Sequence, residues 1–410
     1  MKTLKSGKVL TPLGIGVAFS LFGDSTLYTV LPREDIAVQA GVTLSMVGLL
    51  LGLNRVARMA SNGPVGLLFD RLPRRPIMIL SLFFGAISTL LYAVSYGSGP
   101  YLFARLLWGV CWSGIWIGAN TMALDISSDG DRGHINGRLQ MWFFLGVALT
   151  NFTGGFFTDL FGYREGLWVS TILTLVGVLI WVIFLPETRD AITKNNPTRD
   201  GNDSDSQAFP WRKVLQAAYP LFAVRLVFAG VLASTTILWL QQFIDKGVSI
   251  SGFFVPLATA TGMFSAVRVL ISIISAPLSG KSSDRIGRRW PVIVFLFAAG
   301  TIGMMFMASN NFALAVCGAF LSAATGGGIQ AISPSLIGDT MGNNSHGRAL
   351  GIVYTIGDLG SALGPPAALL LIPILGIGAV YILCSVIFFL ILCYSIYRTT
   401  KEKTIKVNLS

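Results

Sequence analysis

The sequence predicts an all-α membrane protein in which twelve transmembrane helices form two pseudo-symmetric bundles of six. The 410-residue chain is 53% hydrophobic and only 12% charged, and its mean hydropathy is +0.68. A water-soluble domain of this length does not reach such values. Apolar runs of about 20 residues, the length that spans a bilayer, recur along the whole chain. An internal repeat relates the two halves of the chain, which favours two bundles of equal size.

Each apolar run is expected to be a helix, because a segment inside a bilayer must satisfy its own backbone hydrogen bonds. The first run follows a short basic tail, and we interpret it as a retained span and not as a signal peptide. Asp24 interrupts this run, and no small-residue cleavage site follows it. The predicted spans are 12–31, 42–62, 76–96, 100–124, 138–158, 165–186, 216–243, 252–276, 290–308, 311–337, 349–372 and 376–397.

A basic turn between the second and third predicted spans occurs twice in the chain. Both copies read Gly-x3-Asp-Arg-x2-Arg-Arg, and the second copy, from Gly280, lies 214 residues after the first, from Gly66. Asp125 and Asp339 repeat at the same interval. The repeat divides the chain into an N-terminal bundle (1–186) and a C-terminal bundle (214–410). The segment between them, 187–213, is too polar to bury and is predicted to be a cytoplasmic linker.

The net charge of +11 is distributed in a way that indicates membrane orientation and not a nucleic-acid partner. Nearly all Lys and Arg residues lie in alternate loops, whereas the loops on the other side hold only Arg33, Arg164 and Lys246. This asymmetry follows the positive-inside rule. We therefore expect a monomeric multi-pass protein of the cell membrane (plasma or inner membrane), with lipid around it and both termini in the cytoplasm.

Patterns typical of soluble enzymes are not convincing in this sequence. Gly280-Lys281-Ser282 resembles the end of a phosphate-binding loop, but Ser275 stands where that motif needs glycine, and no strand precedes it. All four cysteines lie inside predicted spans without metal-ligand spacing. No catalytic residue, metal site or cofactor is predicted, and we do not expect an enzyme.

The doubled turn resembles the signature loop of the major facilitator superfamily, which lies between helices 2 and 3 and again between helices 8 and 9. The pattern Arg105-x3-Gly109 on the fourth span is similar to a second motif of that family. The run from Asp24 to Pro32 resembles the first helix of its drug-efflux members. The resemblance covers the whole chain. It implies the major facilitator fold and a secondary transporter that moves a small molecule and protons.

One motif of the antiporters in this family is only partly present. Those proteins usually carry Gly-x3-Gly-Pro-x2-Gly-Gly on helix 5, and here Thr150 and Asn151 replace the central Gly-Pro pair. The pair occurs on the eleventh span instead. The residues of these two stretches that are expected to pack helices closely are Gly146, Gly154, Gly155, Gly360, Gly364 and Pro365.

The two basic turns are expected to form a cytoplasmic gate. Asp70 follows the second span and is placed to accept backbone N–H groups at the start of the eleventh, where the helix dipole favours an anion. The family resemblance implies a relay in which Arg74 links Asp70 to Asp125. It implies a second relay through Arg288, between Asp284 and Asp339.

The other residues assigned to the gate are the remaining motif positions, Gly66, Arg71, Gly280 and Arg285. The alternative is that the arginines of the two turns only anchor the topology. We adopt that interpretation for Arg75 and Arg289.

Charged residues inside the spans are candidates for substrate and proton binding, because each costs about 2.5–3.5 kcal/mol at the centre of a bilayer. Asp24 and Asp358 are the acids among them, and both are candidates for proton coupling. A rise of 1.5 Å per residue places Asp24 and Arg105 at a similar depth, so they are expected to pair. The pair either titrates or is a permanent salt bridge. Arg225 lies near the predicted start of the seventh span, where it can reach the surface, and is not counted.

Three tryptophans follow Arg105 on one face of the fourth span, at i+3, i+7 and i+11. They either pack against neighbours or lipid, or form one wall of a cavity for an aromatic or cationic substrate. The equivalent face of the tenth span carries small or polar residues, which leave room opposite this wall. The substrate-cavity candidates are Arg55, Arg58, Arg105, Trp108, Trp112, Trp116, Arg268, Ser322 and Gln330.

These features predict a transporter that works by alternating access, with proton-coupled efflux of an amphiphilic or drug-like compound as the first choice. Two alternatives remain open. Arg55 and Arg268 stand at repeat-equivalent positions, where two guanidinium groups can clamp the carboxylate or phosphate ester of an organic anion. The other alternative, from a different class, is a non-transporting membrane sensor.

Overall fold

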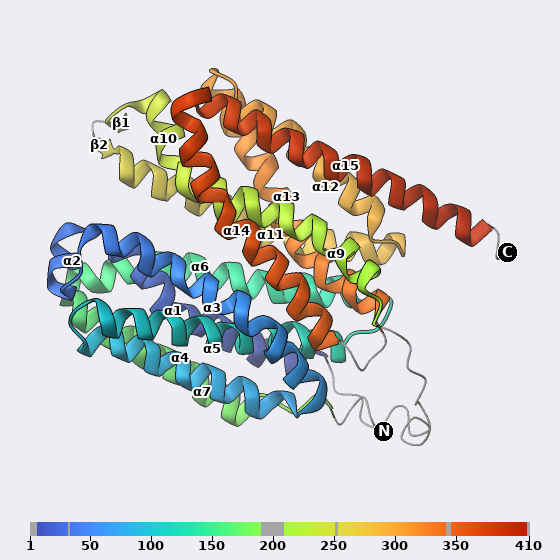
Figure 1. The fold of residues 1–410 in the computed structure, drawn as a ribbon, viewed down its shortest axis with the longest axis horizontal. Coiled ribbons are helices and arrows are strands. Elements are labelled where there is room, and N and C mark those ends of the chain that lie inside the picture. Colours follow the sequence, from blue (N-terminus) through green and yellow to red (C-terminus); the bar gives the residue numbers. More distant parts are fainter. Residues whose placement is uncertain (1–5, 32, 190–208, 251–252, 342–345, 408–410) are drawn as a thin grey trace.

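The computed structural model describes residues 6–31, 33–189, 209–250, 253–341 and 346–407, and nearly all of them are helical (Figure 1). The N-terminal half contains α1 (Ser6–Val30), the short α2 (Glu34–Ala40), α3 (Leu44–Arg71), α4 (Arg74–Val94), α5 (Ser98–Asp125), α6 (Arg132–Phe161) and α7 (Tyr163–Phe184). The C-terminal half contains α9 (Trp211–Val224), the π-helix η2 (Arg225–Leu232), α10 (Ala233–Ile244), β1 (Gly247–Ile250), β2 (Phe253–Pro256), α11 (Leu257–Ile286), α12 (Trp290–Met307), α13 (Phe312–Thr340), α14 (His346–Leu375) and α15 (Ile377–Val407).

The predicted spans all fall on helices, with two differences. The seventh span is made of three consecutive segments, α9, η2 and α10, which run from Trp211 to Ile244. The eighth begins at Leu257 and not at residue 252, because the preceding residues form a hairpin in which Val248 pairs with Val255. β-Branched and aromatic residues favour this strand conformation. Most of the predicted linker 187–213 lies outside the described residues.

Long apolar helices give the molecule the surface of a membrane protein. Ten helices in the described part of the chain are long and apolar enough to cross a membrane. The two other long helices, α3 and α6, have 28 and 30 residues. Large apolar side chains such as Leu80 on α4, Phe295 on α12 and Leu390 on α15 point outwards and are more than half exposed. An apolar surface of this extent is suited to lipid and not to water.

The two Arg-rich turns, 71–75 and 285–289, lie at one end of the molecule, which we call the basic end. The start of α1 lies there, because Pro12 accepts a hydrogen bond from Trp181 near the end of α7, and the turn that follows α7 binds the backbone of Arg74. The end of α15 lies there too, since Arg288 donates to the Thr399 carbonyl. The short helix α2 and the β1–β2 hairpin lie at the opposite end (Figure 1).

Glycines bring the two halves into backbone contact at the basic end. A Cβ atom added at Gly66 on α3 would lie 2.3 Å from the Gly347 carbonyl on α14. A Cβ atom at Gly280 on α11 would lie 2.0 Å from the Gly133 carbonyl on α6. The internal repeat converts the first pair into the second. The contact between the halves is therefore pseudo-symmetric, and it requires glycine at these positions because no other residue lacks a Cβ.

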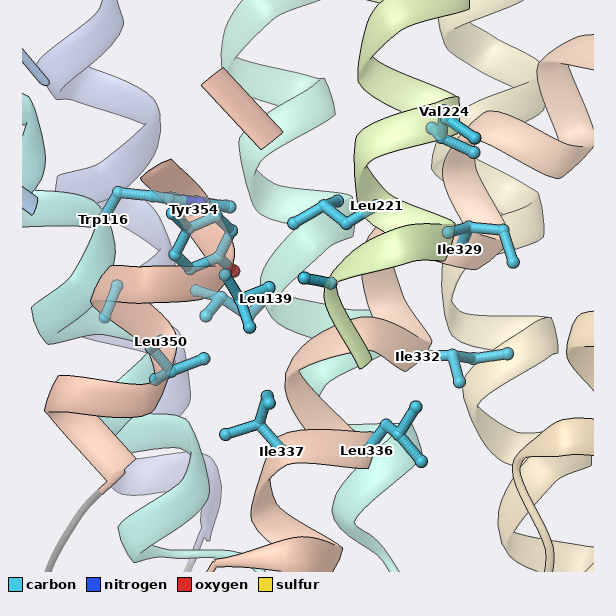
Figure 2. Close-up of a cluster of buried hydrophobic side chains, with 14 of the residues drawn as sticks. Trp116, Leu139, Leu221, Val224, Ile329, Ile332, Leu336, Ile337, Leu350 and Tyr354 are labelled. Carbon is cyan, nitrogen blue, oxygen red and sulfur yellow. The ribbon is translucent and has the colours of Figure 1, made fainter. Parts of the chain in front are cut away.

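Apolar side chains fill the space between the halves towards the basic end. Figure 2 shows Trp116 of α5 beside Tyr354 of α14, with their ring centroids 6.2 Å apart, and Leu139 of α6 close by. Leu221 of α9 and Ile329 of α13 contribute from the C-terminal half. Burial of these side chains from both halves stabilises the joined arrangement, at about 25 cal/mol for each Å² of apolar surface.

Inside each half, glycines of the partial antiporter motif and of its copy lie at close helix contacts. Gly146 faces Ala18 of α1, and Gly154 faces Thr26 of the same helix. Gly360 faces the Phe222 carbonyl of α9, and Gly364 faces Gly230 of η2, where the Pro365 ring also packs. The surroundings of Gly155 lie outside the described part of the structure.

Candidate functional site

Two clusters of charged residues join the halves at the basic end. In the first cluster, Asp70 at the end of α3 accepts hydrogen bonds from the backbone N–H groups of Gly347 (2.8 Å) and Arg348 (2.9 Å), which begin α14. A carboxylate at a helix N-terminus is stabilised by the helix dipole. Arg74 pairs with Asp125 at 3.2 Å, and both side chains are almost fully buried. Asp70 is thus the residue that crosses between the halves.

Two residues after α7 complete this first cluster. Glu187 accepts hydrogen bonds from the backbone N–H groups of Arg74 (3.0 Å) and Arg75 (2.9 Å), so its carboxylate caps the start of α4. The Thr188 hydroxyl donates to Asp125 at 2.7 Å. The sequence does not single out either residue, because both stand at the boundary of the polar segment that is predicted to be a linker.

The second cluster repeats this arrangement around Asp284. Its carboxylate accepts from the backbone N–H groups of Gly133 (2.9 Å) and His134 (2.6 Å), at the start of α6. Arg289 hydrogen-bonds to both Asp284 and Asp339, with 2.7 Å to the latter. Arg132 of the N-terminal half also reaches Asp339, at 2.6 Å. Burial by itself lowers the pKa of the Arg289 guanidinium, but its bonds to the two carboxylates outweigh this effect and raise the pKa above the ordinary value.

The relay residue of the second cluster differs from the prediction, which named Arg288 and treated Arg289 as a topological anchor. Arg288 instead donates to the Thr399 carbonyl, and its Nε atom lies 3.6 Å from Glu402. The two turns differ in backbone conformation, because Pro73 has a φ of −56° whereas its repeat equivalent Gly287 has a φ of +66°. This difference changes which arginine faces the carboxylates. It is Arg74 in the first turn and Arg289, the repeat equivalent of Arg75, in the second.

The remaining arginines assigned to the gate lie on the surface. Arg71 and Arg285 are both exposed at the helix ends. Within the described residues, the structure gives neither of them an ion pair. Arg75 donates to the Val182 carbonyl at 2.5 Å, a hydrogen bond within its own half.

A cavity of about 320 Å³ lies between the halves, on the side of the gate clusters that faces the opposite end. Helices α1, α3, α5 and α6 contribute to its wall from the N-terminal half, and α9, η2, α13 and α14 from the C-terminal half. Its lining combines charged, aromatic and small polar side chains, which are Asp24, Ser25, Asn54, Arg55, Arg58, Trp112, Trp116, Phe143, Arg225, Phe228, Gln330 and Ser361, together with aliphatic residues.

Asp358 of α14 organises the charges beside this cavity. Only 2% of its side chain is exposed, and its Oδ1 atom lies 2.5 Å from both Arg58 of α3 and Arg225 of η2. Asn62 donates to its other carboxylate oxygen at 3.0 Å. One buried carboxylate therefore holds two guanidinium groups, and the pair with Arg58 joins the halves. A buried ion pair of this kind is destabilised by several kcal/mol when one partner is lost.

The discounting of Arg225 was wrong. The helix begins at Trp211, five residues before the predicted start, which places Arg225 about 21 Å inside. Gly357 of α14 lets the Arg225 side chain approach closely, since a Cβ atom at this glycine would lie 2.9 Å from the Arg225 Cδ atom. The π-helical turn that begins at Arg225 is a signal found often at functional sites, but it is visible only in the structure.

Arg55 and Arg268 do not form the predicted clamp. Arg55 lines the cavity and donates to the backbone carbonyls of Ser361 (3.0 Å) and Ala229 (3.2 Å), both in the C-terminal half. Arg268 is not part of the cavity lining, and its guanidinium lies 5.8 Å from the centroid of the Phe228 ring. The cavity arginines are instead Arg55, Arg58 and Arg225.

Asp24 and Arg105 lie together, as their matched depths predict. Arg105 is fully buried and donates to Asp24 at 2.5 Å and to the Leu50 carbonyl at 2.8 Å. Asp24 is 16% exposed and lines the cavity. Arg105, which does not line the cavity, thus fixes the position of Asp24, and the Asp24 carboxylate faces the space that a substrate would enter.

The tryptophan stripe divides into a cavity part and a packing part. Trp112 and Trp116 line the cavity, with ring centroids 5.6 Å apart and nearly parallel planes. Trp108 does not line it and packs against Gly85 of α4. Gln330 is at the cavity as predicted, but Ser322 is buried within α13 and donates to the Ala319 carbonyl. Of the two α13 residues expected opposite the tryptophans, Gln330 therefore lines the cavity with them and Ser322 does not.

Comparisons with known proteins give a family for this architecture. A family model described as Major Facilitator Superfamily matches residues 13–272 and 257–409.

Within the described residues, no group of three or more His, Cys, Asp or Glu side chains is placed to hold a metal ion.

Several curated proteins are similar to the chain over most of its length. The inner membrane transport protein YajR of Escherichia coli is 25% identical over 86% of this chain and 75% of its own length. The multidrug resistance protein MdtG of Proteus mirabilis is 25% identical over 82% of both chains. The class H tetracycline resistance protein of Pasteurella multocida is 21% identical over 87% of this chain and 85% of its own. A solved structure, the human organic anion transporter MFSD10 (TETRAN), shares the fold with a TM-score of 0.78 at 18% identity, over 95% of this chain and 99% of that one.

Proposed function

Because the chain belongs to the major facilitator superfamily, whose members are membrane transporters and not enzymes, we propose that it exports a small amphiphilic molecule by proton-coupled alternating access. The observation that carries this proposal is the position of the central cavity. It lies between the two halves, its lining comes from both, and the gate clusters close it on one side. A rocking motion that breaks the two clusters would open the cavity to the basic end.

The gate clusters are suited to alternate between two arrangements. In each cluster one carboxylate, Asp70 or Asp284, binds backbone N–H groups of the opposite half. In the second cluster the Arg132–Asp339 pair also crosses between the halves. The pairs Arg74–Asp125 and Arg289–Asp284 lie within one half each, so they persist when the halves separate. Only the contacts across the interface need to break, and water replaces them as it enters.

Asp24 is the proposed proton-coupling carboxylate. It faces the cavity and is held by Arg105, so its charge is balanced when the cavity is empty. A proton on Asp24 would release Arg105, and a substrate that contacts this region would change the balance between the two states. Asp358, which pairs with Arg58 and Arg225, remains the second candidate.

An amphiphilic substrate fits the mixture of side chains around the cavity. The faces of Trp112 and Trp116 provide a flat apolar wall, and polar groups such as Gln330 lie at other points of the lining. Relatives named for multidrug and tetracycline resistance support efflux as the direction. The distribution of basic residues supports a cytoplasmic location for the basic end.

Transport by the purified protein in proteoliposomes tests this proposal. A pH gradient is imposed, and accumulation of a lipophilic aromatic cation and of an aromatic sulfonate is measured with and without a protonophore. We expect gradient-dependent accumulation of at least one compound, and replacement of Trp112 by Ala to raise the concentration needed for half-maximal transport. Binding without accumulation for every compound would contradict transport and favour the sensor.

A second candidate is the carriage of an organic anion, and the charge of the cavity supports it. Three arginines, Arg55, Arg58 and Arg225, line the described wall. They outnumber the carboxylate of Asp358, which binds two of them, and the carboxylate of Asp24 is paired with Arg105. A carboxylate or sulfonate can accept from such guanidinium groups in a bidentate manner. The fold neighbour named as an organic anion transporter agrees with this candidate, although it shares only the fold.

The two candidates differ in their response to Arg55→Gln. Loss of this guanidinium should weaken binding of the aromatic sulfonate by about tenfold or more, because a charge-assisted hydrogen bond is worth about 1.5–3 kcal/mol. Binding of the aromatic cation should not weaken. Arg268→Gln serves as the matched control, since Arg268 does not line the cavity. Unchanged sulfonate affinity in Arg55→Gln would remove the organic-anion candidate.

A further inference from the structure

A second cavity, of about 650 Å³, lies at the basic end of the C-terminal half. The starts of α9 and α12 and the ends of α13 and α15 surround it. Six cationic side chains line its described wall, which are Arg212, Lys213, Arg288, Arg289, Arg398 and Lys401. The lining also includes the carboxylates of Asp339 and Glu402, which already lie beside Arg289 and Arg288. The cavity therefore has an excess of positive charge.

The internal repeat shows what fills the equivalent place in the N-terminal half. There the carboxylate of Glu187 binds the backbone N–H groups at the start of α4. Gly162 and Gly376 both have a positive φ just before α7 and α15, so the interval of 214 residues holds where these helices begin. In the sequence this interval aligns Lys401 with Glu187, although Glu187 follows the end of α7 whereas Lys401 still belongs to α15. A carboxylate of the first half is thus replaced by a lysine in the second.

Arg289 precedes α12, and within the described residues no side chain caps the start of this helix. The end of a helix that exposes N–H groups favours an anion, and here the cationic side chains add to that preference. We propose that this cavity binds a phosphate-bearing anion, which occupies the place that Glu187 fills in the other half.

The side chains of the cavity are suited to hold a phosphate group. Arg398 hydrogen-bonds to Gln216 and lies over the Trp290 ring, with 5.1 Å from its guanidinium carbon to the ring centroid. These contacts fix the orientation of its guanidinium, which presents several donors in one plane. The phosphate belongs either to the head group of an anionic lipid or to a soluble phosphate ester. Basic pockets between transmembrane helices bind lipid head groups in other membrane proteins.

Occupation of this cavity would also affect the gate. Arg289 lines the cavity and at the same time holds Asp284 and Asp339 in the second gate cluster. An anion beside Arg289 should hold this guanidinium in its place in the gate cluster and so stabilise the closed gate. This consequence rests on the proposed function, whereas binding itself does not.

Binding is measured on the purified full-length chain in neutral detergent, by native mass spectrometry and by the thermal unfolding midpoint. The probes are dioleoyl phosphatidylglycerol, dioleoyl phosphatidylcholine as the zwitterionic comparison, and inorganic phosphate. We expect saturable binding of phosphatidylglycerol, of inorganic phosphate, or of both, with phosphatidylcholine bound at least about tenfold more weakly than phosphatidylglycerol. Binding of phosphatidylglycerol alone identifies a lipid site, and binding of inorganic phosphate identifies a site for the phosphate group itself. No saturable binding of either anion would overturn the proposal.

Two charge reversals locate the site. Lys401→Glu restores the carboxylate that the other half has, and it should weaken binding of the anion by at least about tenfold. It should also raise the unfolding midpoint measured without added anion. Lys281→Glu makes the same charge change on an exposed residue of the basic end outside the cavity, and it should leave binding unchanged. Equal losses in the two variants would show attraction to the overall charge and would refute a site. Both side chains are exposed, so neither change disturbs the core.

Discussion

Replacement of Arg58 by Gln should shift the protein towards the state that is open at the basic end. Arg58 of the N-terminal half and Arg225 of the C-terminal half bind the same carboxylate oxygen of Asp358, each at 2.5 Å. The Arg58 pair crosses between the halves, whereas the Arg225 pair lies within one half. The first pair therefore exists only while the halves are joined, and its loss acts on the joined state alone.

The size of this shift follows from the burial of the pair. Arg58 is 15% exposed and Asp358 is 2% exposed, so water screens their interaction little. A hydrogen bond between charged groups contributes about 1.5–3 kcal/mol. In Arg58→Gln, Asp358 still has Arg225 and Asn62 as partners, so no buried carboxylate is left alone. The loss corresponds to a change of about ten- to a hundredfold in the ratio of open to closed molecules.

Distances between spin labels at the basic end measure this ratio. Arg71→Cys and Arg285→Cys provide one label on each half, because both side chains are exposed and lack ion pairs among the described residues. The native cysteines are replaced first, at Cys111, Cys317, Cys384 and Cys393. The ratio of the long-distance to the short-distance population should grow by about ten- to a hundredfold in Arg58→Gln.

Arg225→Gln is the matched control for this experiment. It removes a guanidinium from the same carboxylate, but the pair that it breaks lies within the C-terminal half. The distance distribution should therefore remain that of the parent protein. An unchanged distribution in Arg58→Gln, or the same shift in both variants, would refute the view that this pair joins the halves in one state only.

Three further predictions concern the gate, the coupling and the topology. Asp70→Asn should sharply reduce transport but leave the protein folded and inserted, because the charged acceptor for two backbone N–H groups of α14 is lost; normal transport rates would show that the motif serves orientation alone. Asp24→Asn should retain substrate binding and exchange in proteoliposomes but lose accumulation driven by a pH gradient, and undiminished accumulation would transfer the coupling role to Asp358. Single cysteines at Ser98 and Ser282 should react with impermeant reagents from opposite sides of the membrane; reaction of both from the outside would contradict the proposed topology.

Several features of the site were accessible from the sequence because they depend on spacing along one helix or on the internal repeat. The pairing of Asp24 with Arg105 follows from their matched depths in two spans of known direction. The meeting of Asp70 with the start of α14 follows from the loop motif and from the preference of helix N-termini for anions. In both cases the sequence contains the distances that matter, since helices have a constant rise per residue.

Other features depend on how helices rotate and on the backbone of single turns. Arg289, and not Arg288, completes the second gate cluster because Gly287 adopts a conformation that its repeat equivalent Pro73 cannot reach. Ser322 and Trp108 lie on the predicted helices, but Ser322 faces Met307 of α12 and Trp108 faces Gly85 of α4, both in their own half. A repeat in the sequence does not reveal such differences between two otherwise equivalent turns.

The sequence by itself determined the twelve spans, the two-fold repeat and the side on which basic residues gather. These are local properties, because each apolar run must satisfy its own hydrogen bonds inside a bilayer. Only the tertiary structure decided which charges meet around Asp358. Asp358 lies about 130 residues from Arg225 and 300 residues from Arg58 along the chain, and their contact exists because α3, η2 and α14 converge at one point between the halves. The energy of a buried charge depends on its partners in space, and the order of residues along the chain does not specify them.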